Sequence, residues 1–142
     1  MSARDYDRYH RFLSALKGRR SFVTVATNSI KVHIDKDKKG GIFLWLDPPW
    51  EFRKNGTFIE TAATYPDHAE PDYERRFELW GNRFKPIFAN TIEEVTASPE
   101  GSLLIKFEGG YEMFLPGDDS VQTDVWYDHW YFRDATRNIF RR

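Results

Sequence analysis

The spacing of apolar side chains changes once near the start of the chain. Up to Gly18 they recur every three or four residues, which is the spacing of a helix with one apolar stripe. The residues that form this stripe are Tyr9, Phe12, Leu13 and Leu16. After Gly18 the apolar positions alternate with polar ones, as they do in strands. The pattern therefore predicts an N-terminal helix over residues 1–18, followed by a β-rich region over residues 19–134.

Short alternating runs separated by turn residues continue through most of this region. Strands are predicted at Phe22–Val25, Ile30–Ile34, Ile42–Leu46, Thr57–Ala62, Phe77–Trp80, Phe84–Phe88, Ile92–Ala97, Ser102–Phe107, Tyr111–Leu115 and Val125–Phe132. Residues 47–76 contain four prolines and form the irregular part, with a long loop over Pro66–Glu74. The turns Asn28-Ser29 and Gly109-Gly110 join strands that are adjacent in sequence, so the strands should be antiparallel.

These elements predict a single domain, residues 1–142, of the α+β class. We expect the helix to pack on a twisted antiparallel sheet of about six to eight strands, as in a meander of hairpins. Residues 135–142 form a basic tail with three arginines. The hairpin around Val32–Ile34 and Ile42–Leu46 resembles the hairpin of Leu104–Phe107 and Tyr111–Leu115. Two alternative explanations of this likeness are an internal duplication and the common chemistry of hairpins.

Composition narrows the classes of function. The 142 residues include no cysteine, which excludes disulfides and thiolate metal sites. The net charge of −1 argues against a nucleic-acid partner, and no apolar run is long enough for a membrane span. The charged N-terminus has no apolar core of a secretory signal, so a cytoplasmic location is expected. We expect no cofactor and, on balance, a binding protein rather than an enzyme.

The charge pattern singles out the C-terminal region. Residues 108–134 contain seven acidic residues and one arginine, together with seven aromatic residues. Exposed aromatic side chains surrounded by acids are typical of a surface that binds a basic protein. The candidate anchors are Trp126, Tyr127, Trp130 and Tyr131, and the candidate steering charges are Asp118, Asp119, Asp124 and Asp128. The alternative is that these aromatic side chains fill a core, because both faces of the predicted strand carry them.

Two other patterns leave an enzyme or ligand-binding domain open. His33, Asp35 and Asp37 alternate on one strand, and His68 lies among acids in the Pro66–Glu74 loop, so either group could contribute metal ligands or acid–base catalysts. The run Asp47-Pro48-Pro49-Trp50 resembles the motif of adenine N6-methyltransferases. Against that function, the chain has no glycine-rich loop between a strand and a helix for the methyl donor.

The second half of the chain resembles a known class of protein. GSLLIKFEGGYEMFLPGDD, followed by Trp126 and Trp130, is similar to the closing hairpin of small bacterial immunity-type β-proteins. The resemblance covers residues 101–130 most closely and residues 13–132 loosely. It implies a protein that neutralises a cognate toxin, such as a basic nuclease, by occluding its active site or an adjacent surface. An inhibitor of a bacterial defence protein would use the same physics and stays open as an alternative.

Overall fold

The computed structural model describes residues 10–35, 41–98, 101–117, 130–134 and 139–140, with the backbone alone for 131–134 and 139–140. The strands in chain order are β1 (Arg20–Ala26), β2 (Ser29–Ile34), β3 (Ile42–Leu46), β4 (Glu51–Lys54), β5 (Thr57–Thr61), β6 (Asn90–Ala97), β7 (Leu103–Phe107), β8 (Tyr111–Leu115), β9 (Trp130–Asp134) and β10 (Ile139–Phe140). Every strand pairing in this part of the chain is antiparallel, as the turns predicted.

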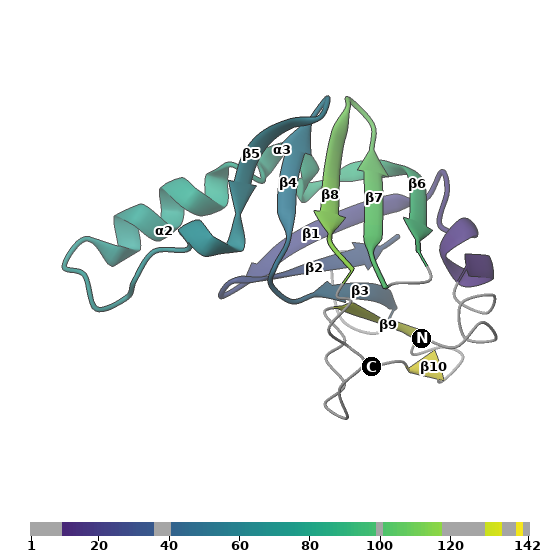
Figure 1. Ribbon diagram of the computed structural model, residues 1–142, viewed down its shortest axis with the longest axis horizontal. Coiled ribbons are helices and arrows are strands. Elements are labelled where there is room, and N and C mark those ends of the chain that lie inside the picture. Colours follow the sequence, from purple (N-terminus) through teal and green to yellow (C-terminus); the bar gives the residue numbers. More distant parts are fainter. Residues whose placement is uncertain (1–9, 36–40, 99–100, 118–129, 135–138, 141–142) are drawn as a thin grey trace.

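The ten strands form one continuous sheet that consists of two halves. Its order is β10-β9-β3-β2-β1-β6-β7-β8-β4-β5. The halves meet where β1 pairs with β6 over only two residue pairs, Arg20 with Thr91 and Ser21 with Asn90. Figure 1 shows the strands of one half running across those of the other. The inner faces of the two halves enclose the core between them.

The helices are short and few within the described residues. Residues 10–14 are helical and residues 15–18 form turns, so the predicted N-terminal helix ends at residue 14 instead of 18; its residues 1–9 lie outside the described part. The others are the 3₁₀ helix η1 (Ala62–Thr64) and the helices α2 (Tyr73–Asn82) and α3 (Lys85–Phe88). The chain is therefore mostly β, and α+β describes it only loosely. Among the described residues no helix has the length and apolar character needed to cross a membrane.

Two predicted strands were wrong. Phe77–Trp80 lies in α2, and Phe84–Phe88 overlaps α3. Tyr73, Phe77 and Trp80 are spaced four and three residues apart, so a helix places these apolar side chains on one face. Figure 1 shows α2 projecting from the sheet, with its inner end beside β5.

One strand in the irregular region was not predicted. β4 carries a single buried apolar side chain, Phe52, between charged residues, so it has almost no strand pattern. It pairs with β5 through the Asn55-Gly56 turn and with β8 on its other side. The predicted strand at Thr57–Ala62 and the hairpins β1–β2, β2–β3 and β7–β8 are confirmed.

Two buried tryptophans connect the ends of strands to distant turns. The Trp50 indole is fully buried, and its Nε1–H donates to the Asn28 carbonyl oxygen at 2.9 Å. The Trp130 indole is also buried, and its Nε1–H donates to the Gly101 carbonyl oxygen at 2.8 Å. Asn28 lies in the β1–β2 turn and Gly101 in the β6–β7 turn. Each indole therefore satisfies a turn carbonyl inside the fold.

We expect Trp50→Phe and Trp130→Phe each to lower the free energy of unfolding by about 1–3 kcal/mol, because each removes the donor of a turn carbonyl together with part of a packed ring. Urea denaturation measures both. Phe58→Ala is the control, since 54% of the Phe58 surface is exposed. A tryptophan variant as stable as this control would contradict the structural role.

Candidate functional site

The described residues settle the position of only part of the predicted partner-binding surface. Trp130 is 5% exposed and belongs to the core, so its side chain is not a surface anchor in the folded protein. Tyr131 lies in β9, where only its backbone is described. The remaining candidates lie outside the described residues; they are Asp118, Asp119, Asp124, Trp126, Tyr127 and Asp128.

The two histidine patterns form no three-residue metal-ligand group among the described residues. The His33 side chain is buried in β2, 3.4 Å from the Thr24 hydroxyl, while Asp35 is paired with Arg19. Asp37 lies outside the described residues. His68 is exposed, and its ring meets the ring of Tyr73. Nowhere in the described part of the chain do three or more His, Asp or Glu side chains gather as a metal ion would need.

The Asp47-Pro48-Pro49-Trp50 run has a structural role. The Asp47 carboxylate accepts hydrogen bonds from the Ser29 hydroxyl at 2.8 Å and from the Trp45 indole at 2.6 Å. The Trp50 ring is fully buried, so it cannot stack on a flipped base as a methyltransferase requires. The four residues instead carry the chain from β3 to β4, and thus from one half of the sheet to the other.

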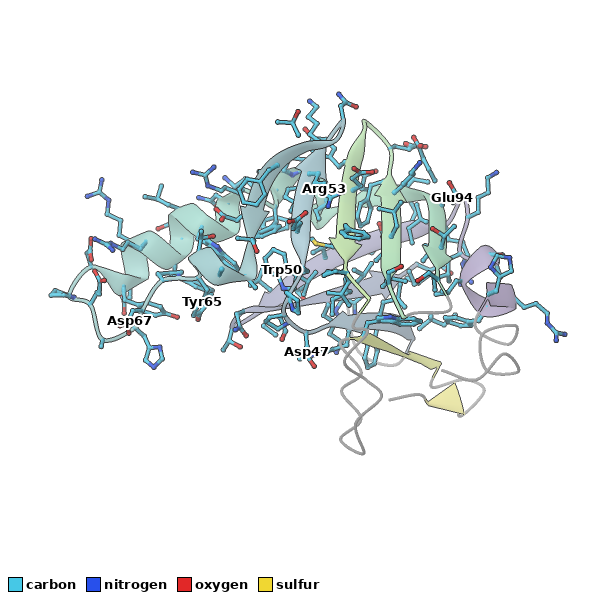
Figure 2. The ribbon with its side chains drawn as sticks, viewed as in Figure 1. Asp47, Trp50, Arg53, Tyr65, Asp67 and Glu94 are labelled. Atoms are coloured by element: carbon cyan, nitrogen blue, oxygen red, sulfur yellow. The ribbon has the colours of Figure 1, made fainter. Side chains whose placement is uncertain are left out.

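A second candidate surface lies on the segment that projects from the sheet. We call residues 65–82, the loop after η1 together with α2, the arm. Figure 2 shows Tyr65 and Asp67 along it, far from Asp47. One face of the arm is a run of aromatic rings in contact, since Tyr65 meets Tyr73, Phe77 and Trp80 with ring centroids 5.2 to 6.3 Å apart. These contacts make the loop and α2 one packed unit.

The two tyrosines at the start of this face share a hydrogen bond. The Tyr65 and Tyr73 hydroxyls are 2.6 Å apart. The pKa of Tyr65 is raised from 10.0 to about 12. The main cause is the removal of its hydroxyl from water, and the hydrogen bond with Tyr73 is the second. The neutral phenol is the form that this packing stabilises.

A buried carboxylate fixes the inner end of the arm. The Glu60 side chain, 8% exposed, pairs with Arg83 at 3.1 Å. It also accepts hydrogen bonds from the Thr61 backbone N–H at 3.1 Å and from the Thr64 hydroxyl. These bonds join the end of β5, η1 and the residue that follows α2. Trp80 adds a donor to the same cluster, because its indole N–H lies 3.3 Å from the Thr64 hydroxyl.

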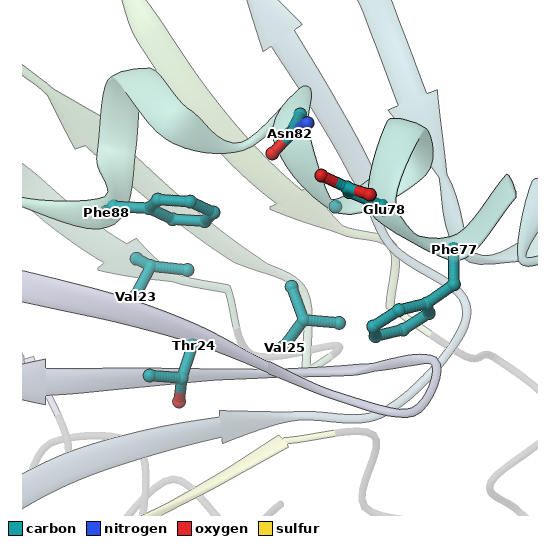
Figure 3. Close-up of a pocket in the computed structure, with 8 residues that line it drawn as sticks. Val23, Thr24, Val25, Phe77, Glu78, Asn82 and Phe88 are labelled. Carbon is teal, nitrogen blue, oxygen red and sulfur yellow. The ribbon is translucent and has the colours of Figure 1, made fainter. Parts of the chain in front are cut away.

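An apolar groove opens between the base of the arm and β1. Its volume is about 650 Å³, and its lining residues are Val23, Thr24, Val25, Phe77, Glu78, Gly81, Asn82 and Phe88. Figure 3 shows Phe88 above Val23 and the Phe77 ring beside Val25. Glu78 and Asn82 supply its charged and amide groups. The groove is thus an apolar site with few polar groups, in the size range of binding pockets.

The arm is acidic on its solvent side. It contains five acidic residues and two arginines, all of them exposed. Arg76 pairs with both Glu70 and Asp72, at 2.8 and 2.9 Å. Within the described residues Glu74 and Glu78 form no ion pair. Their charges remain available to a basic partner. Leu79 follows Glu78 in α2, and 59% of its surface is exposed.

The arm and the groove are not among the sites that the sequence predicts. A loop and a strand are predicted where the arm lies, although Tyr73, Phe77, Trp80 and Phe84 follow one helical stripe. That spacing was the signal that could have revealed α2. The groove joins β1 to residues more than fifty positions later, so no local pattern indicated it.

Comparisons with known proteins found no match: no protein-family model, no curated protein and no solved structure is similar to the chain.

The Tyr65–Tyr73 hydrogen bond predicts a pH effect on stability. The folded state holds the Tyr65 proton more tightly than the unfolded state, so this contribution is complete below pH 10 and is lost as the pH rises toward 12. NMR titration of ¹³Cζ-labelled tyrosine should show one residue, absent in Tyr65→Phe, that titrates near 12. Tyr73→Phe should lower that pKa. A Tyr65 that titrates near 10.0, the ordinary value of a tyrosine, would contradict this description.

The Glu60 cluster predicts a second effect on stability. Glu60→Ala should reduce the free energy of unfolding by about 1–3 kcal/mol, because Thr61 N–H and the Thr64 hydroxyl lose their buried acceptor. The control is Glu74→Ala on the exposed side of α2, which should change it by less than about 0.5 kcal/mol. Thermal melts of both variants test this, and equal melting temperatures would contradict the role of Glu60.

Proposed function

We propose that the chain binds a protein partner, as an immunity or antitoxin-like protein that neutralises a cognate toxin by covering its active site or an adjacent surface. A cytoplasmic location is part of this proposal. The observation that carries it is the acidic arm with an apolar groove at its base. The C-terminal resemblance to immunity-type proteins supports the same class.

The groove and its rim suit an anchor residue of a partner. Binding hot spots are apolar or aromatic side chains that fill a pocket and exclude water around them. The groove offers the pocket, lined by Phe77 and Phe88 over the valines of β1. The Phe88 side chain in its lining is 37% exposed, and Leu79, the residue after Glu78, is 59% exposed. Burying such side chains against a partner stabilises the complex.

The charge of the arm favours a basic partner. Its five acidic residues and two arginines give it a net charge of −3, whereas the net charge of the whole chain is only −1. A local field of this sign speeds the approach of a positively charged protein at low ionic strength. A lysine or arginine beside the partner's anchor would meet Glu78 at the edge of the groove. A toxic nuclease with a basic active-site surface has this chemistry.

Affinity capture from the native cell is the experiment that tests the proposal. The tagged chain is washed at low and at high salt, and retained proteins are identified by mass spectrometry. A stoichiometric basic protein whose toxicity or enzymatic activity falls when the chain is added would support the proposal. A partner without such activity, or none at either salt, would contradict it. The identity of the partner also separates a toxin from a defence protein.

The captured partner then allows a test of the surface itself. Leu79→Ser should weaken binding about tenfold or more, because it removes an exposed apolar side chain of the arm that follows Glu78, a residue of the groove. Phe58→Ser, on the β4–β5 hairpin, is a matched control of similar exposure and should bind normally. Calorimetry measures both. Equal affinities, with the folds intact, would place the interface elsewhere.

A further inference from the structure

The strand order of the sheet is the same from either end. Outward from β1 the neighbours are β2, β3, β9 and β10; outward from β6 they are β7, β8, β4 and β5. Each half therefore contains three consecutive strands and then a hairpin. In sequence, β4–β5 follows β3 and β9–β10 follows β8, so each hairpin lies at the edge of the opposite half. This is the arrangement of two equal units that exchange their last hairpins.

Backbone contacts at the centre match residue by residue. The Arg20 carbonyl oxygen accepts from the Asp35 N–H at 2.7 Å, and the Thr91 carbonyl oxygen accepts from the Glu108 N–H at 3.0 Å. Arg20 and Thr91 are themselves partners in the β1–β6 pairing. They thus hold equivalent places on the two sides of an approximate two-fold axis.

The registers extend this correspondence through the core. Starting from the central pair, and allowing for the extra residue of the bulge between Ile92 and Glu94 in β6, the strand pairings match apolar positions of one half with apolar positions of the other. The matched buried pairs are Val23 and Val95, Ile30 and Leu103, Val32 and Ile105, Ile34 and Phe107, Leu44 and Met113, Leu46 and Leu115. Every member of these pairs is buried, so the two inner faces are built alike.

Two features outside the hairpins repeat as well. The Trp50 indole donates to the carbonyl oxygen of Asn28, and the Trp130 indole donates to that of Gly101. These two acceptors directly precede Ser29 and Ser102, which occupy equivalent positions in the two halves. The buried residues Leu13, in the N-terminal helix, and Leu16, in the turn after it, stand seven and four positions before Arg20. Phe84 and Ile87, also buried, stand seven and four positions before Thr91. Common hairpin chemistry explains neither the repeated tryptophan contacts nor the repeated spacing of these buried residues before the central pair.

We infer that the chain is two copies of one unit, a helix followed by five strands, joined in tandem. The outer edges of β3 and β8 are docking edges. Each edge fits the terminal hairpin of the other copy of the unit, as β9–β10 fits β3 and β4–β5 fits β8 in this chain. The arm is then the connection between the copies. This inference is independent of the proposed function, which concerns what the arm and the groove bind.

Exchange of strands within the full-length chain tests the equivalence. In the matched variant, Ile30–Ile34 of β2 and Leu103–Phe107 of β7 replace one another. In the control, Ile42–Leu46 of β3 and Leu103–Phe107 of β7 replace one another. Both variants keep the length, the composition and the inward positions of apolar side chains. Only the first moves each segment to its equivalent place.

We expect the matched variant to melt cooperatively within about 10 °C of the parent, because cores accept apolar exchanges that keep volume and pattern. The control should melt at least about 10 °C lower still or lose its cooperative transition, because its aromatic residues meet the wrong neighbours. Calorimetry and circular dichroism record both. Equal melting temperatures for the two variants, or a matched variant that is the less stable, would overturn the inference.

Discussion

The burial of Trp50 holds together the parts of this molecule that sequence places far apart. Trp50 stands where the chain crosses from β3, in one half of the sheet, to β4, in the other. Its indole satisfies the Asn28 carbonyl in the β1–β2 turn, and its rings pack on Trp80 and Phe84 at 5.9 and 5.5 Å. One side chain thereby fixes the crossing, a turn and the inner end of the arm. Because Trp80 belongs to α2, the base of the arm packs directly on this anchor.

Much of the sheet could be predicted because its signals are local. Alternation and turn glycines identified the hairpins β2–β3 and β7–β8, where both Gly109 and Gly110 have positive φ values. Local signals failed at β4, whose only buried apolar residue is Phe52. They were also misread at α2, where a short window around Phe77–Trp80 hid the helical spacing that a longer window shows. The order of the sheet halves depends on hairpins that cross to the opposite half, and neighbouring residues do not encode that step.

The candidate site was less accessible to sequence reasoning. The principle that acids and exposed apolar residues attract a basic protein was applied to the C-terminal region, whereas among the described residues this combination lies on the arm. Aromatic residues on both faces of the last predicted strand left their role undecided. Trp130 is a core residue, and the acceptor of its indole hydrogen bond is the carbonyl oxygen of Gly101, which lies 29 positions earlier in the chain. A contact of that range has no local signature.

Hydrogen–deuterium exchange of the chain, alone and in complex with its captured partner, tests the account most directly. If the arm and groove form the interface, the partner should slow amide exchange within residues 65–82 and around Val25, while β7 and β8 keep their exchange rates. Slowed exchange confined to residues 118–131, with the arm unaffected, would contradict the account and return the interface to the C-terminal acidic and aromatic region.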